Sequence, residues 1–325
     1  MKRLLVYFSV LVGCLFVGLT TYYMIKNYEG LSTSRADSEV ITLNQGDELE
    51  ILVTHSKKHD DTVVTAKFDK EGVASYDLET GILKALRGGE TVLTIETNNK
   101  KLPVFNYNIS VGDGQSSSPW FIKSEEDLRK INAKDENGAI AWKLDQCYSL
   151  QEDIALTGEW TPIGGYVKTD DGEKTESDIQ FFIGSFLGNN HTISNFSITK
   201  DAYTGGLFGA IGKLATISSL NLKNVNIKGY YYYVGALAGL NQGAMVERVQ
   251  VSDATITVTG NSTLELLTSG SYTQDENNVG GLIGADFAYR VDDASNKYST
   301  NQITLCSFDG KINVDNKNIN NTAYS

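Results

Sequence analysis

Four consecutive tyrosines, Tyr230–Tyr233, are the residues of this 325-residue chain whose chemistry best suits ligand binding. If the segment is extended, successive side chains point to opposite faces, so at least two of the four rings point outward. Exposed tyrosines can stack on sugar rings or contact proteins. We therefore predict ligand contacts at Tyr230, Tyr231, Tyr232 and Tyr233. The alternative is that these rings stack on one another along the edge of a repeating coil.

Residues suited to catalysis or metal binding are sparse. The chain has no His-Glu-x-x-His, no Gly-x-Ser-x-Gly and no phosphate-binding loop. The acidic pairs Asp170-Asp171 and Asp292-Asp293 lie in polar insertions, and His55 and His59 flank two lysines, as expected of a solvated loop. We predict no catalytic, cofactor or metal residues and a protein that is not an enzyme. The acidic composition is compatible with calcium, but solubility explains it more simply.

Charge and cysteine content exclude several classes of partner. A net charge of −12 argues against nucleic acid and against adsorption to anionic lipid by charge alone. The three cysteines are too few and too scattered for a disulfide framework. Cys306 occupies an apolar repeat position and is expected to be a small core residue.

The N-terminal segment, residues 1–30, has the features of a targeting signal. Lys2 and Arg3 precede an uncharged run, Leu4–Ile25, which is long enough to cross a membrane as a helix. The positive charges favour an N-terminus inside the cell and the remaining chain outside. We predict an uncleaved transmembrane helix. Leu11–Cys14 also resembles a lipobox, which would make Cys14 a lipidation site, and a cleaved signal is the third possibility.

A glycine-rich pattern recurs through the second half of the chain. Its conserved spacing falls on Gly205, Gly206, Gly209, Gly235, Gly239, Gly280, Gly281 and Gly284. Between the copies lies an apolar triplet with the spacing of Ile217-x-x-Leu220-x-Leu222. It occurs four times, beginning at Ile193, Ile217, Val246 and Ile303, at intervals of 24, 29 and 57 residues. Such periods are typical of solenoids.

The triplets alternate apolar and polar residues with a period of two, which predicts short strands with one buried face. Corners of Asn, Asp and Gly and few prolines favour a right-handed parallel β-helix over helical repeats. The repeated glycines are expected where a side chain would clash or φ is positive. Polar insertions are expected at 165–177, 260–278 and 286–301.

The glycine-rich segment also resembles a known family. Gly205–Gly209 is similar to the GLUG repeat of bacterial surface proteins, and Gly184–Ile193 resembles the segment that precedes that repeat. The resemblance covers residues 119–325. It implies an extracellular solenoid of adhesin-like proteins and some secreted proteases, and by itself implies no activity.

Residues 38–112 predict a separate β-domain. Seven short alternating segments between turn residues are typical of a β-sandwich. Val73–Tyr76 and Gly81–Ile95 resemble the group 2 bacterial Ig-like (Big) domain, which implies a spacer or binding module. The composition of 112–118 predicts a flexible linker. After it, Ser124–Ile131 predicts a short helix with an N-cap serine, placed to cover the first coil.

These features predict an all-β protein outside a bacterial cell, anchored by residues 1–30. Its expected function is adhesion or ligand display by a rigid β-helix, with a protein or glycan of a host or neighbouring cell as partner. The alternatives are the non-catalytic stalk of an enzyme whose catalytic domain lies beyond residue 325, or a carbohydrate-active β-helix. The last residues resemble the approach to another coil, so the chain is expected to continue.

Overall fold

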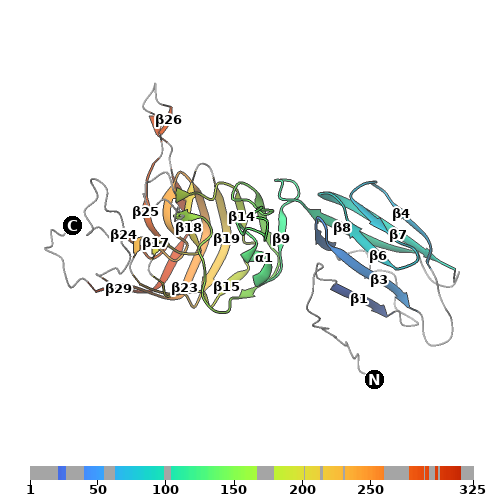
Figure 1. The fold of residues 1–325 in the computed structure, drawn as a ribbon, viewed down its shortest axis with the longest axis horizontal. Helices are drawn as coiled ribbons and strands as arrows, with labels where there is room; N and C mark the ends of the chain where they lie inside the picture. The colour runs from blue at the N-terminus through green and yellow to red at the C-terminus, as the bar shows by residue number, and fades with distance from the viewer. Residues whose placement is uncertain are drawn as a thin grey trace, which may run out of the picture. The chain divides into compact units, whose positions relative to one another are not determined.

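The computed structural model describes residues 21–26, 40–54, 63–98, 104–166, 179–200, 202–212, 215–229, 231–259, 278–288, 290–292, 297–298 and 301–315. The chain divides into two compact units, Met1–Val111 and Gly112–Ser325. Nearly all regular structure in the described ranges is β, and one short α-helix lies in the second unit (Figure 1). The prediction of an all-β protein is confirmed at this level.

The first unit consists of two four-stranded sheets that enclose one apolar core. One sheet has the order β1-β3-β6-β5 and the other β2-β8-β7-β4. Residues from both sheets, such as Leu49, Leu83, Leu93 and Ile109, are almost completely buried together. The strands are β1 (Thr21–Lys26), β2 (Val40–Asn44), β3 (Glu48–Thr54), β4 (Val63–Phe68), β5 (Ala74–Tyr76), β6 (Ile82–Ala85), β7 (Gly89–Thr97) and β8 (Phe105–Gly112).

Strand β1 lies where a membrane helix was expected to end. Thr21–Lys26 pairs in parallel with β3, so the last residues of the predicted span Leu4–Ile25 are a strand. β-Branched and aromatic residues dominate this segment, which favours a strand. No helix in the described ranges is long and apolar enough to span a membrane. Residues 1–20, including Cys14, lie outside those ranges, so the anchor and the lipidation site stay predictions.

The second unit is a stack of parallel strands, an arrangement consistent with a β-helix or solenoid (Figure 1). We call residues 112–315 the coil stack. An eleven-stranded sheet runs along it, beside the three-stranded sheets β17-β21-β24 and β18-β22-β25. The elements are β9 (Trp120–Ile122), α1 (Glu125–Arg129), β10 (Cys147–Leu150), β11 (Ile154–Ala155), β12 (Gly165–Tyr166), β13 (Ile179–Gln180), β14 (Ser185–Leu187), β15 (Thr192–Ser194), β16 (Ser197–Ile198), β17 (Ala202–Gly205), β18 (Phe208–Gly212), β19 (Thr216–Lys223), β20 (Asn226–Gly229), β21 (Tyr231–Val234), β22 (Ala238–Gln242), β23 (Met245–Thr259), β24 (Asn278–Val279), β25 (Ile283–Asp286), β26 (Arg290–Asp292), β27 (Lys297–Tyr298), β28 (Gln302–Thr304) and β29 (Ser307–Asp315).

The strand register confirms part of the predicted ladder and corrects its first step. Ile217 lies beside Val246, and Val246 beside Ile303, as the spacing predicts. Ile193, however, lies beside Leu222, and Phe186 is the neighbour of Ile217. The interval of 24 residues was therefore wrong, and the first coil has the same 29-residue offset as the second.

The error has a local cause at the corners. Asn195, Asn224 and Asp253 each have a positive φ of 53–59° and stand one above another. The Asn224 side chain donates to Asn195 Oδ1 at 2.7 Å, which ties two coils together. Because Asn195 is a corner, Ile193 and Phe196 flank a bend, so the apolar triplet that begins at Ile193 imitates the ladder spacing without matching its register.

The N-terminal end of the coil stack is covered, as predicted. α1 begins after Ser124, whose hydroxyl accepts a hydrogen bond from Asp127 N at 3.1 Å. Leu128 is fully buried with Ile122 of the first coil. Residues 112–118, expected to be a flexible linker, form a hydrogen-bonded turn: Gly114 N donates to Ser118 O, and the Ser118 hydroxyl donates to Asp113 Oδ1. An Asp side chain that closes its own turn explains the difference.

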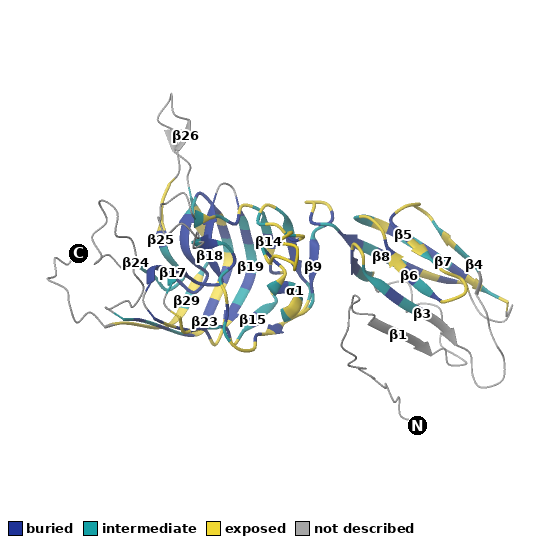
Figure 2. Ribbon diagram, viewed as in Figure 1, coloured by how far each residue is buried: buried dark blue, intermediate teal, exposed yellow. Residues whose placement is uncertain are grey.

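The C-terminal end differs from the N-terminal end. β28 and β29 stack on β23, but their inward-facing residues are exposed where the corresponding β23 residues are buried (Figure 2). Ile256 is 0% exposed, whereas its neighbour Ile312 is 42% exposed. The apolar ladder therefore reaches the last described coil without being covered there.

Candidate binding surfaces

The tyrosines predicted to contact a ligand are buried. Tyr231, Tyr232 and Tyr233 are 0%, 7% and 8% exposed, so the expectation that at least two of the rings point outward is wrong for these three. Tyr230 lies outside the described residues. The reason is that both faces of β21 are covered: Tyr231 belongs to the main core, and Tyr232 and Tyr233 belong to a second apolar cluster.

This second cluster is the alternative that the sequence left open, tyrosines stacked across coils. The rings of Tyr203 and Tyr232, one coil apart, are parallel, with centroids 5.0 Å apart. Tyr233 meets both edge-on. Tyr166 of β12 and Phe181 after β13 pack against the cluster, so the insertion between these strands covers it at its ends. The cluster stabilises the insertion and offers no exposed aromatic platform.

The repeated glycines lie where no side chain fits. A Cβ atom added to any of the eight would lie within 3.0 Å of another atom. Gly209, Gly239 and Gly284 form a column: the Cβ of Gly239 would lie 2.9 Å from Gly209 O, and that of Gly284 2.6 Å from Gly239 O. Gly206 also has a positive φ of 152°. The predicted structural role of these glycines is confirmed.

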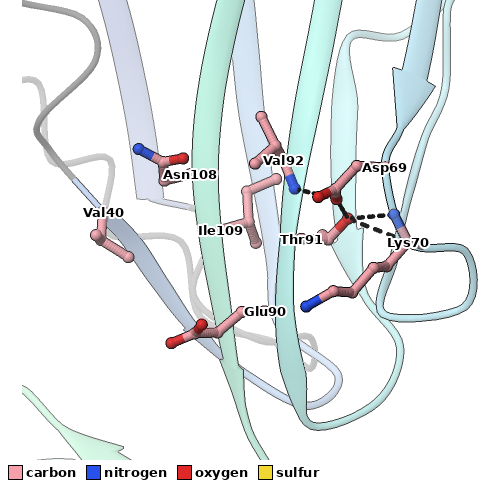
Figure 3. Close-up of a pocket in the computed structure, with 8 residues that line it drawn as sticks. All are labelled: Val40, Asp69, Lys70, Glu90, Thr91, Val92, Asn108 and Ile109. Atoms are coloured by element: carbon pink, nitrogen blue, oxygen red, sulfur yellow. Dashed lines mark hydrogen bonds between the residues drawn. The ribbon is translucent and has the colours of Figure 1, made fainter.

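A groove of about 320 Å³ lies on the sheet β2-β8-β7-β4 of the first unit (Figure 3). Four strands or their connecting turns contribute to it. Val40 and Val92 supply apolar surface, while Lys70, Glu90 and Asn108 supply polar groups. In Figure 3 the side chains of Lys70 and Glu90 extend from neighbouring segments toward the same side of the view. The groove therefore combines a cation, a carboxylate and an amide.

Asp69 fixes one wall of this groove. Its carboxylate accepts hydrogen bonds from Val92 N at 2.7 Å and the Thr91 hydroxyl at 2.8 Å (Figure 3). These bonds hold the pKa of Asp69 below its usual value, the bond from Val92 contributing most. Asp69 is thus committed to structure, and Lys70 next to it is positioned by the same turn.

Two smaller hollows lie beside the cap of the coil stack and share Asn132. One, of about 270 Å³, is lined by Trp160 and Arg129, with the Arg129 guanidinium 5.1 Å from the ring centroid of Trp160. The other, of about 350 Å³, is lined by Lys143, Phe181 and Ile183. Arg129 is held by Glu125 and by the carbonyl oxygen atoms of Thr157 and Glu159. Trp160 is buried, as the sequence predicts.

Other sequence candidates do not assemble into a site. Within the described ranges, no three His, Cys, Asp or Glu side chains gather where they could hold a metal ion. His55, His59 and the pair Asp170-Asp171 lie outside those ranges. His191 Nδ1 lies 3.3 Å from Asp153 Oδ1, and the Asp153 carboxylate also accepts from Thr192 N, which joins two coils at a corner.

Sequence reasoning missed the groove on the first unit. Its residues come from segments separated by up to 69 positions, Val40 to Ile109, and no motif connects them. The only signal was the Gly88-Gly89 turn, which sets where β7 begins and so where Glu90 stands.

Comparison with curated proteins identifies one similarity. Halomucin of Haloquadratum walsbyi is 32% identical over 181 residues, which is 54% of this chain and 2% of halomucin. The chain thus spans a small fraction of that relative. No family model matches the chain, and no solved structure matches it.

Proposed function

We propose that this protein acts outside the cell as an adhesin-like display protein, with the coil stack as a rigid arm and the groove of the first unit as a contact surface. The observation that carries the proposal is the in-register stacking of coils. Phe186, Ile217 and Val246 lie one above another and are completely buried. Such a column resists bending, since each coil contacts only its neighbours along a continuous core.

The similarity to halomucin supports the surface-type assignment. A protein with that name is a mucin-type protein, and the shared stretch covers more than half of this chain. A GLUG-type β-helix, a Big-type domain and an anchor at residues 1–30 complete the proposal. Each rests on the sequence patterns described above.

The groove suits a polar ligand such as a glycan or an extended peptide. Lys70 and Glu90 offer opposite charges, and Val40 and Val92 offer a small apolar patch for a sugar ring or a side chain. Neither charged group is needed for the hydrogen bonds that hold the Asp69 turn, which involve the Asp69 carboxylate, the Thr91 hydroxyl and backbone atoms. Replacing both side chains should therefore alter binding and leave the sheet intact.

The test is a glycan and matrix-protein array probed with the purified full chain, with and without calcium. The Lys70→Ala/Glu90→Ala variant should lose at least about 90% of any reproducible signal. The matched control is Lys84→Ala/Glu48→Ala, which removes an exposed ion pair from the opposite sheet of the same unit. The control should bind like the parent. Equal binding by both variants would contradict the groove, and a silent array would contradict ligand display.

A further inference from the structure

The outer edge of β29 is an unpaired strand edge with an apolar inner face. Within the described residues, β29 pairs with β23 alone. Ile312 and Val314 are 42% and 47% exposed, although their neighbours Ile256 and Val258 on β23 are fully buried. A strand edge that combines free backbone groups with exposed apolar side chains is a template for another strand.

The opposite end of the coil stack cannot supply that strand. α1 and the following segment cover the first coil, with Leu128, Ile131 and Trp142 buried against it. Head-to-tail stacking of two molecules would require this end to be open. A contact between two copies through β29 is therefore tail-to-tail, which gives a closed two-fold dimer.

We propose that a second copy of this chain docks on β29 by antiparallel pairing of the two β29 strands, centred on Gly310. The inference is independent of the proposed ligand groove. It extends the apolar ladder of one coil stack into that of the other and buries the residues that are exposed in a single copy.

The direction in which side chains point restricts the register. Phe308, Gly310, Ile312 and Val314 are the neighbours of buried β23 residues, so they face inward, and Asp309 and Lys311 face outward. Inward residues of one copy must lie opposite inward residues of the other, because a shift by one residue would place apolar groups against solvent. The two-fold axis must therefore pass through a residue of β29.

Charge then selects one register. A centre at Gly310 sets Asp309 opposite Lys311 of the second copy, and Lys311 opposite its Asp309, while Phe308 faces Ile312. A centre at Asp309 or at Lys311 would instead place like charges directly opposite each other, which is destabilising. Of the registers centred within Ser307–Asn313, only the one at Gly310 forms opposite-charge pairs, and it forms two.

The experiment measures the mass of the full chain by sedimentation equilibrium over a range of concentrations, in a mild detergent because residues 4–25 are apolar. The parent should show a monomer–dimer equilibrium. Lys311→Asp creates two like-charge contacts and should raise the dimer dissociation constant by about tenfold or more. The double swap Asp309→Lys/Lys311→Asp restores both pairs and should return the constant to within about threefold of the parent value.

The control is Lys228→Asp, the same charge change at an exposed outward position of β20, which should leave the dissociation constant unchanged. Circular dichroism checks that every variant keeps its β-structure. A parent that is monomeric at all concentrations would overturn the proposal, as would a dimer that is insensitive to Lys311→Asp. Species larger than a dimer would contradict two-fold closure, and a double swap that fails to restore pairing would contradict the register.

Discussion

At the N-terminal end of the coil stack, Leu128 of α1 is completely buried, whereas at the C-terminal end Ile312 of β29 is 42% exposed. Both residues are apolar and both face the core. The difference lies in what covers them: a helix with a serine cap at one end, and nothing among the described residues at the other. In a solenoid the value of a ladder residue for stability therefore depends on its position along the stack, because each coil is buried only by its neighbours.

The largest expected effect compares two adjacent positions of one ladder row. Ile256→Ala removes a fully buried side chain between two coils and should lower the free energy of unfolding by about 4 kcal/mol. Ile312→Ala, one coil further, should lower it by less than about 1.5 kcal/mol, because part of the side chain is already in water. Urea denaturation at low protein concentration measures both. Equal losses would show that the last coil is covered.

A second variant tests whether the N-terminal cap is part of the core. Leu128→Ala leaves a cavity beneath α1 and should lower the free energy of unfolding by about 3 kcal/mol. Leu187→Ala is the matched control, because Leu187 is 36% exposed on β14 of the same unit. The control should change stability by less than about 1 kcal/mol in the same denaturation assay. A cap that separates from the coils would make the two variants indistinguishable.

A smaller effect is expected from the helix cap itself. Ser124→Ala removes the acceptor for Asp127 N and should cost about 1 kcal/mol. Ser116→Ala, at an exposed turn position outside the helix, should be neutral. The difference in melting temperature between the two variants measures the cap. No difference would mean that tertiary packing alone holds α1 in place.

The smallest effect is a pH dependence of the cap. Partial burial opposes ionisation of Glu125, but hydrogen bonds from Arg129 and Thr157 outweigh it and hold the pKa below its usual value. Since the folded pKa is lowered, the stabilisation is present above the usual glutamate pKa and is lost as the pH falls through the folded value. We expect Glu125→Gln to reduce the stability lost between pH 7 and pH 3 by less than about 1 kcal/mol. An unchanged acid dependence would contradict this role.

The repeat architecture could be predicted because it depends on local spacing. The seven alternating segments of the first unit are all strands, and the positions of Gly209, Gly239 and Gly284 mark where coils approach each other. The N-cap at Ser124 follows from the same short-range rules. Each of these features is encoded within a few residues of where it acts.

The rest could not be predicted because it depends on contacts across coils. The burial of Tyr232 and Tyr233 requires Tyr203, about 30 positions earlier, and the insertion that carries Tyr166. The register of Ile193 required the corner at Asn195, which period-two spacing does not reveal. The Lys70–Glu90 groove combines four separate segments, so no single stretch of sequence contains it.

Hydrogen exchange of the backbone amides tests the central claim, that the coil stack is closed at its N-terminal end and open at its C-terminal end. The full chain at high dilution should show strong protection in peptides that cover Trp120–Ile131 and much weaker protection in peptides that cover Ser307–Asp315. Protection of β29 should rise with protein concentration, whereas that of β9 and α1 should not. Strong, concentration-independent protection of β29, or faster exchange in β9 than in β29, would contradict the account.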